Sequence, residues 1–247
     1  MPGMIIVVPC FNEAERLDPG AFLQFAAERD WLHFLFVDDG SRDGSRELFA
    51  NMERECPAQV QTLSFAENQG KAEAVRRGLL LALEAKPDLV GFWDADLATP
   101  LGEIDGFVSR FDSDADLEMV LGSRVRLLGT DIERKPARHY FGRFAATLAS
   151  AVLGLAVYDT QCGAKLFRVN ETLRSILAEP FLTRWIFDVE ILARWLQLRT
   201  AERGRVAHFI REVPVASWYD VSGSRLKPRD FARVPLDLWR VHWRYRS

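Results

Sequence analysis

The chain has 247 residues, of which 48% are hydrophobic and 27% charged, a composition that supports a full globular core and excludes a disordered chain. Its three cysteines form no C-x-x-C pair, so they exclude a disulfide framework or cysteine zinc site and favour a reducing compartment. The formal net charge of −3 hides two basic segments, 124–143 and 225–247, which favour anionic ligands or a membrane surface over general nucleic-acid binding.

Strand and helix patterns alternate along the first half of the chain. Short β-branched or aromatic runs predict strands at 4–9, 33–37, 60–65, 89–93 and 119–122. Helices are predicted between them at 18–30, 44–55, 71–85 and from Thr99-Pro100 onward. This alternation predicts an α/β fold with a Rossmann-like, mostly parallel sheet covered by helices on both faces.

The apolar run 89–93 ends abruptly in two carboxylates, Asp94 and Asp96. Side chains two residues apart on an extended segment share a face, so both can point at one hard cation. A partly hydrated Mg²⁺ or Mn²⁺ shared with a diphosphate suits such a pair. The alternative is a surface turn that happens to carry two acids.

Polar segments follow each of the first four predicted strands. In a parallel sheet these segments meet at one edge, where ligands bind in open α/β folds. Together they favour a nucleotide-diphosphate site, in which Asp38 and Asp39 serve the base or ribose and Lys71 and a metal serve the phosphates. No glycine-rich dinucleotide motif or P-loop motif follows the first strand, which argues against a dinucleotide-binding or P-loop protein.

The second half begins with a basic loop that contains Arg124 and Arg138 and leads into an apolar helix at 144–155. This juxtaposition fits an anion site beside an apolar surface, as a lipid phosphate requires, although a solvated basic loop is equally compatible. A strand is expected at 159–167, where Gln161 and Lys165 are further candidate contacts.

A helix is predicted around Phe187, and it carries Asp188 and Glu190. The two acids lie about 200° apart around a helix axis, so both cannot face one ligand. Asp188 lies at the edge of the apolar arc and Glu190 farther from it, so we predict that Asp188 belongs to the site.

The C-terminal segment repeats apolar residues at three- and four-residue steps, with Trp239 and Trp243 alongside and arginines interspersed. Such a helix can lie in a membrane interface, and equally it can pack on the domain. We expect Pro235 to break or restart it. The sequence has no run of about 18 apolar residues, so we expect a cytoplasmic protein, peripheral at the cytoplasmic membrane face or held there by a membrane partner protein.

Five ordered motifs resemble those of glycosyltransferase family 2, and later segments resemble its polyprenyl-phosphate and dolichyl-phosphate sugar transferases. The motifs are Val8-Pro9-Cys10-Phe11-Asn12-Glu13, Val37-Asp38-Asp39-Gly40-Ser41, Asn68-Gln69-Gly70-Lys71-Ala72, Trp93-Asp94-Ala95-Asp96 and Gly122-Ser123-Arg124. The later segments are 138–143, 159–167 and 187–190.

The resemblance implies a single GT-A domain over 1–247, with a nucleotide-sugar half at 1–123 and an acceptor half at 124–247. It implies that Pro9, Glu13, Asp39 and Lys71 hold the nucleotide of a UDP-glucose or GDP-mannose type donor. Asp94 and Asp96 would hold the metal. The implied reaction is inverting transfer of a hexose to a polyprenyl-phosphate lipid. From the basic loop and the helix-face argument above, we expect Arg124, Arg138 and Asp188 at the acceptor.

Two departures and three alternatives stay open at this point. Many family members have transmembrane helices that this sequence lacks, and Ala98 stands where mannose-using relatives often have Gln, which leaves the sugar open. The alternatives are a glycosyltransferase with a hydroxyl acceptor, a haloacid-dehalogenase-type phosphatase, whose motif Asp94-Ala95-Asp96 mimics, and a catalytically silent binding protein.

Overall fold

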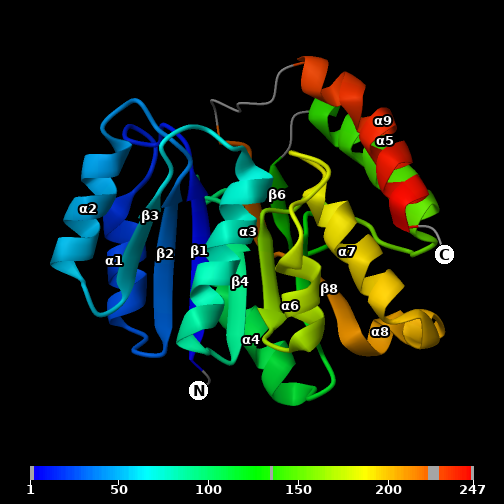
Figure 1. The fold of residues 1–247 in the computed structure, drawn as a ribbon, viewed down its shortest axis with the longest axis horizontal. Coiled ribbons are helices and arrows are strands. Elements are labelled where there is room, and N and C mark those ends of the chain that lie inside the picture. The colour runs from blue at the N-terminus through cyan, green and yellow to red at the C-terminus, as the bar shows by residue number, and fades with distance from the viewer. Residues whose placement is uncertain (1–2, 134–135, 222–227, 246–247) are drawn as a thin grey trace. The chain divides into compact units, whose positions relative to one another are not determined.

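The computed structural model of the protein describes residues 3–133, 136–221 and 228–245 (Figure 1). The chain forms two compact units. Unit 1 comprises Met1–Leu97 and Gly163–Pro180, and unit 2 comprises Ala98–Cys162 and Phe181–Ser247. The halves predicted from the sequence, 1–123 for the nucleotide sugar and 124–247 for the acceptor, are functional assignments, and they stay a prediction.

Unit 1 contains five neighbouring strands of the main sheet, in the order β3-β2-β1-β4-β7. Its strands are β1 (Met4–Cys10), β2 (Leu32–Asp38), β3 (Val60–Ser64), β4 (Leu89–Trp93) and β7 (Ala164–Arg168). The first four run parallel, with Met4 of β1 in register with Leu32 and Leu89, whereas β7 is antiparallel to β4. The mostly parallel α/β sheet predicted from the sequence is therefore confirmed.

Helices cover both faces of this sheet. They are α1 (Pro19–Ala27), α2 (Ser45–Glu55), α3 (Lys71–Ala82), which continues as a 3₁₀ turn (Leu83–Ala85), and α6 (Glu171–Ala178). Phe36 on one face of β2 contacts Phe22 of α1 and Phe49 of α2. Val37 on the opposite face meets α3 at Gly78, where a Cβ would lie 2.8 Å from its side chain. Gly78 thus lets α3 lie close to the sheet, which offsets its low helix propensity.

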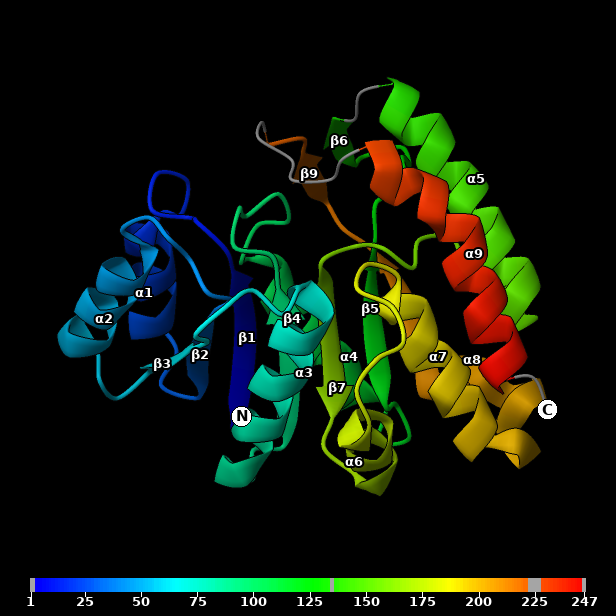
Figure 2. The same cartoon turned by 45° about the horizontal axis from the view of Figure 1, so that its top comes forward.

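Unit 2 pairs β5 (Met119–Ser123) with β8 (Ile210–Pro214), and β6 (Asp131–Glu133) with β9 (Ser217–Tyr219). Its helices are α4 (Glu103–Ser113), α5 (Pro136–Leu153), α7 (Phe187–Leu198), a 3₁₀ turn (Thr200–Arg205), α8 (Val206–Phe209) and α9 (Pro228–Tyr245). Helix α9 lies along α5 and also packs on α7 (Figure 2). Among the described residues, no helix is long and apolar enough to cross a membrane.

Two predictions about elements are wrong in their details. The strand expected from residue 159 begins at Ala164, because Asp159 and Thr160 lie in the loop that precedes it. Helix α9 continues through Pro235 without a break. Proline removes one backbone hydrogen bond, and the buried side chains of Leu238 and Val241 that follow compensate for it.

Candidate active site

The segments that follow β1 and β2 in unit 1 are joined by short hydrogen bonds. The Asn12 N–H donates to Ser41 Oγ at 2.8 Å, and the Glu13 N–H donates to Ser45 Oγ at 2.6 Å. In return the Arg42 N–H donates to Asn12 Oδ1 at 2.8 Å. Asn12 has a positive φ of 51°, which this residue type tolerates better than most. The two strand ends therefore form one rigid rim.

Asp39 connects that rim to the segment that follows β3. Its buried carboxylate accepts from the N–H groups of Gln69 and Gly70 at 2.6 and 2.8 Å, and from Asn68 Nδ2 at 2.8 Å. Gly40 permits the close approach, because it has φ 69° and a Cβ there would lie 2.5 Å from the Glu67 carbonyl carbon. Asp39 therefore fixes the loop that leads into Lys71.

Asp38 is held in the same way, within its own turn. Asp38 is 1% exposed. Its carboxylate accepts hydrogen bonds from the Ser41 N–H at 2.9 Å and from Arg46 Nε at 3.2 Å. Both predicted nucleotide acids thus shape the rim of the site, and their contact with a nucleotide stays a prediction. Pro9 is half-buried near the end of β1, in register with Val37.

The carboxylates at the end of β4 each face a cation of unit 1. Lys71 Nζ lies 2.5 Å from Asp94 Oδ1, and Arg16 lies 3.4 Å from Asp96 Oδ2. Arg16 also lies 3.5 Å from the buried Glu13. The Asp94 and Asp96 side chains remain 35% and 28% exposed, so ligands can reach them. Acids and bases of four strand ends are thus gathered at one edge.

Gly163 is a residue of this site that sequence reasoning missed. The Asp94 N–H donates to the Gly163 carbonyl at 2.9 Å, and a Cβ at residue 163 would overlap the Asp94 carboxylate. Only glycine leaves room for that side chain. The signal available in the sequence was the position of Gly163 within the 159–167 segment that carries the family resemblance.

Asp94 and Asp96 have the chemistry to hold a divalent cation. Among the described residues, no group of three or more acids, histidines or cysteines could enclose a metal ion by itself. Two partly exposed carboxylates instead offer hard oxygen ligands and leave the remaining positions to diphosphate oxygens and water, a donor set that suits Mg²⁺ and Mn²⁺ alike. The residues present therefore fit the expected metal.

Cys10 lies beneath the site and is chemically quiet. Burial raises the pKa of its thiol well above the ordinary value, and the charges of Glu13, Asp38 and Asp94 raise it further. A neutral thiol is a poor nucleophile and a poor metal ligand. Cys10 therefore acts as a small buried side chain.

The predicted acceptor residue Arg124 is engaged in unit 2 by Asp159. The guanidinium donates through two nitrogens to the two carboxylate oxygens at 2.6 and 2.8 Å, and the Arg124 N–H donates to the same acid at 3.0 Å. Glu212 holds this loop by accepting from the N–H groups of Tyr158 and Asp159. Arg124→Ala would leave a buried carboxylate without its main partner, so that substitution tests stability as well as acceptor binding.

Asp188 and Glu190 differ sharply in their surroundings. Gln161 Nε2 donates to Asp188 Oδ2 at 3.3 Å, which brings two of the candidate residues together. Glu190 is fully buried and accepts from the Leu182 N–H, from Arg194 and from the Tyr245 hydroxyl. Glu190 lies away from the predicted apolar arc and is nonetheless buried, because every residue of α7 from Phe187 to Leu196 is buried. The catalytic role of Asp188 stays a prediction.

The two remaining candidates are Lys165, which is buried, and Arg138, whose side chain the structure does not describe. Lys165 is 1% exposed on β7, and its Nζ lies 5.2 Å from the centre of the Phe92 ring. Arg138 belongs to α5, and its side chain lies outside the described residues.

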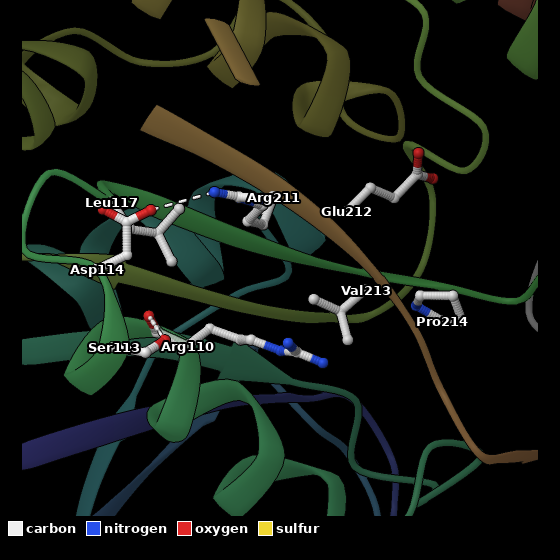
Figure 3. Close-up of a pocket in the computed structure, with 8 residues that line it drawn as sticks. All are labelled: Arg110, Ser113, Asp114, Leu117, Arg211, Glu212, Val213 and Pro214. Carbon is white, nitrogen blue, oxygen red and sulfur yellow. Dashed lines mark hydrogen bonds and ion pairs between the residues drawn. The ribbon is translucent and has the colours of Figure 1, made fainter. Parts of the chain in front are cut away.

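A hollow of about 370 Å³ lies between α4 and β8 of unit 2 (Figure 3). Its lining includes an exposed ion pair between Arg211 and Asp114 at 3.1 Å, and the Glu212 carboxylate points away from it. None of the predicted site residues lines this hollow, so the strand ends of unit 1 remain the candidate site.

The fold belongs to a known structural class. A glucosyl-3-phosphoglycerate synthase from Mycobacterium tuberculosis, solved with Mn²⁺, UDP-glucose and phosphoglyceric acid, superposes with a TM-score of 0.67 at 18% identity. That match covers 98% of this chain and 80% of the other. The GT-A fold predicted from the sequence is therefore confirmed.

Sequence comparison identifies the family within that class. Residues 5–173 match the family described as glycosyl transferase family 2. The chain therefore belongs to glycosyltransferase family 2, and the predicted hexosyltransferase is confirmed as an enzyme of this kind. The predicted resemblance to lipid-phosphate sugar transferases is confirmed as well.

Three relatives illustrate that resemblance. The dolichyl-phosphate beta-glucosyltransferase of Dictyostelium discoideum is 31% identical, over 97% of this chain and 74% of its own length. The enzyme of the same name from Saccharomyces cerevisiae is 31% identical, over 90% and 68%. Polyprenol monophosphomannose synthase of Mycolicibacterium smegmatis is 27% identical, over 70% and 63%.

Proposed function

We propose that this enzyme transfers a hexose from a nucleotide sugar to a polyprenyl- or dolichyl-phosphate lipid, with inversion at the sugar carbon and with a divalent metal ion. The observation that carries the proposal is the paired arrangement of Lys71 with Asp94 and Arg16 with Asp96 at one edge of a parallel sheet. This arrangement suits a diphosphate that brings its own metal ion, because each carboxylate can exchange a cationic partner for the metal.

Donor binding is assigned to unit 1. When bound, the metal ion would be held by Asp94 and Asp96 and would neutralise the diphosphate. Lys71 is placed by the Asp39-anchored loop at the first residue of α3, where its ammonium can also contact phosphate oxygens. The rim built on Glu13, Asp38 and Asp39 would enclose the nucleoside.

Glucose is the favoured sugar and uridine the favoured base. The glucosyltransferase relatives match nearly the whole chain, whereas the mannose synthase matches 70% of it. The structural neighbour that contains UDP-glucose supports the same donor type. GDP-mannose is the alternative that the binding experiment below distinguishes.

In the transfer step, an oxygen of the acceptor phosphate forms a bond to the anomeric carbon of the sugar. The bond from that carbon to the β-phosphate oxygen breaks, and the leaving nucleoside diphosphate takes the electron pair. A phosphate monoester has its second pKa near 6, so at neutral pH it is largely a dianion and needs little general-base help. Lys71 stabilises the charge that develops on the leaving group.

The second candidate function is sugar transfer to a hydroxyl acceptor, and the position of Asp188 favours it. This acid is buried in the first turn of α7 and held by Gln161, as a general base would need to be. The phosphatase alternative is excluded by membership of family 2. For the lipid reaction, we place the enzyme at the cytoplasmic membrane face, where its acceptor is accessible.

Thermal unfolding with UDP and with GDP, each with Mn²⁺ or with excess chelator, tests the donor site. We expect UDP with Mn²⁺ to raise the melting temperature, and Asp96→Asn to abolish this rise together with transfer of labelled glucose to polyprenyl phosphate. Asp112→Asn, a change at an exposed acid of α4, is the matched control and should behave as wild type. Equal stabilisation in chelator would contradict the metal bridge. Metal-dependent binding without any transfer would favour the silent binding protein.

A further inference from the structure

Helix α9 has two apolar faces, one buried within unit 2 and one exposed. The inner face consists of Leu238, Val241 and Tyr245, which are at most 8% exposed. The opposite face carries Leu236, Trp239 and Trp243, which are 47%, 57% and 52% exposed. The two tryptophans contact each other edge to face with ring centres 6.0 Å apart. A core helix does not require this second apolar face.

Three exposed arginines lie directly beside that second face. At 100° per residue, Leu236, Trp239 and Trp243 fall within about 60° of one another, and Arg233, Arg240 and Arg244 occupy the next sector of about 40°. The inner face lies about half a turn away. We call the six residues of these two sectors, Leu236, Trp239, Trp243, Arg233, Arg240 and Arg244, the α9 outer face.

We propose that the α9 outer face docks on an anionic lipid membrane, with the helix lying in the plane of the interface. This proposal rests on the proposed function, since a polyprenyl-phosphate acceptor remains in a bilayer. Tryptophan prefers the boundary between headgroups and acyl chains, where its ring is in apolar surroundings and its N–H stays hydrated. The arginines beside it can reach lipid phosphates while their stems cover apolar surface.

The neighbouring helix α5 also exposes an apolar side chain. Helix α5, which packs along α9, exposes Phe144 at 58%, and no charged side chain occurs from 144 to 157. Arg143 immediately precedes this stretch, so a cationic residue again borders an apolar one, Phe144. Both helices of the pair thus present apolar residues at the surface, with arginine nearby.

Charge argues against the competing occupant, a second copy of this chain. In a two-fold dimer the same patch meets itself, so a dimer across the α9 outer face would oppose one row of arginines with another. An anionic lipid surface instead supplies the opposite charge along the whole row. It also accepts the indoles without requiring a matching groove.

The test is sedimentation with vesicles that contain neither acceptor lipid nor nucleotide. Vesicles of phosphatidylcholine alone are compared with vesicles containing phosphatidylglycerol, across a salt series. We expect binding to the anionic vesicles at low salt that weakens as salt rises, and a loss of at least about tenfold in affinity in Arg233/Arg240/Arg244→Glu. Trp239→Ala/Trp243→Ala should lose a similar amount at every salt concentration, because apolar insertion is not screened.

Matched variants separate this surface from charge and apolarity in general. Arg54/Arg203/Arg205→Glu makes the same change in net charge at exposed positions outside α9, and Leu198→Ala removes an equally exposed apolar residue from α7. Both should bind as wild type does. Circular dichroism and UDP-dependent stabilisation confirm that every variant is folded.

The outcomes are decisive in either direction. Absence of binding to anionic vesicles at low salt, or binding unchanged in both α9 variants, overturns the proposal. A concentration-dependent dimer that the tryptophan variant abolishes overturns it in favour of self-association. Because no acceptor or donor is present, failure here leaves the proposed reaction standing, and failure of the transfer assay leaves this result standing.

Discussion

Gly163 shows how far the geometry of one acid depends on a distant residue. Its carbonyl accepts from the Asp94 N–H, and the space that a side chain would need is occupied by the Asp94 carboxylate. We predict that Gly163→Ala displaces this carboxylate and destabilises the protein by about 1–3 kcal/mol. UDP with Mn²⁺ should then stabilise the variant less than the wild type, as measured by thermal unfolding.

Gly106→Ala is the matched control for that substitution. Gly106 lies inside α4, and nothing lies within 4 Å of the position of an added Cβ. Alanine there should stabilise the helix by about 0.5–1 kcal/mol and leave the UDP response unchanged. If Gly163→Ala retains a wild-type response to UDP and Mn²⁺, the positioning of Asp94 does not depend on this close approach.

At the scale of elements, a buried polar cluster ties the C-terminus of α9 to α7. The Tyr245 hydroxyl donates to Glu190 at 2.8 Å and accepts from Arg194 Nε at 3.0 Å. Arg194 donates to Glu190 at 2.8 Å, and the Leu182 N–H donates to Glu190 at 2.9 Å. Glu190 therefore anchors two helices and the segment that precedes α7, the helix whose first turn carries Asp188.

We predict that Tyr245→Phe destabilises the protein by about 1–2 kcal/mol at neutral pH, because it leaves buried partners without one hydrogen bond. Burial and the bond to Glu190 raise the pKa of Tyr245 above its usual value near 10. The native state therefore holds this proton more tightly than the unfolded state. Its contribution is complete below pH about 10 and is lost as the pH rises through the native pKa.

Urea unfolding at several pH values measures this contribution. The difference between wild type and Tyr245→Phe should be constant near neutral pH and shrink above pH about 10. Tyr219→Phe, at an exposed position of β9, is the control and should change stability little at neutral pH. A difference that grows with pH would contradict the sign of the Tyr245 shift.

The elements that could be predicted are those whose signal is local. The apolar run of β4 and the strand ends after β1 to β4 follow from short-range periodicity, and parallel pairing then brings Lys71 to Asp94. The contacts that could not be predicted depend on partners far along the chain. Asp159 engages Arg124 from 35 positions away, and Glu190 is buried together with every other residue of α7 from Phe187 to Leu196. A helix-face argument assumes a solvated side, which α7 lacks from Phe187 to Leu196.

At the scale of the whole molecule, the candidate donor and acceptor residues belong to different units. Asp94 and Asp96 lie in unit 1, whereas Arg124, Gln161 and Asp188 lie in unit 2. If the units divide the work in this way, donor binding and transfer can be altered separately. Substitutions in unit 1 should affect both properties, whereas substitutions at Asp188 should affect transfer alone.

We predict that Asp188→Asn keeps the wild-type response to UDP with Mn²⁺ and retains part of its transfer to polyprenyl phosphate. The acceptor phosphate is already anionic above its second pKa near 6, so the rate in wild type and variant alike should rise through that pH and then level off. Steady-state transfer of labelled glucose across pH measures this, with Asp116→Asn, at an exposed acid of unit 2, as the control. Loss of the UDP response would place Asp188 in the donor site. A fall of about 10²–10⁴-fold in a folded variant would contradict this prediction and show that Asp188 takes part in the transfer step, as a general base does.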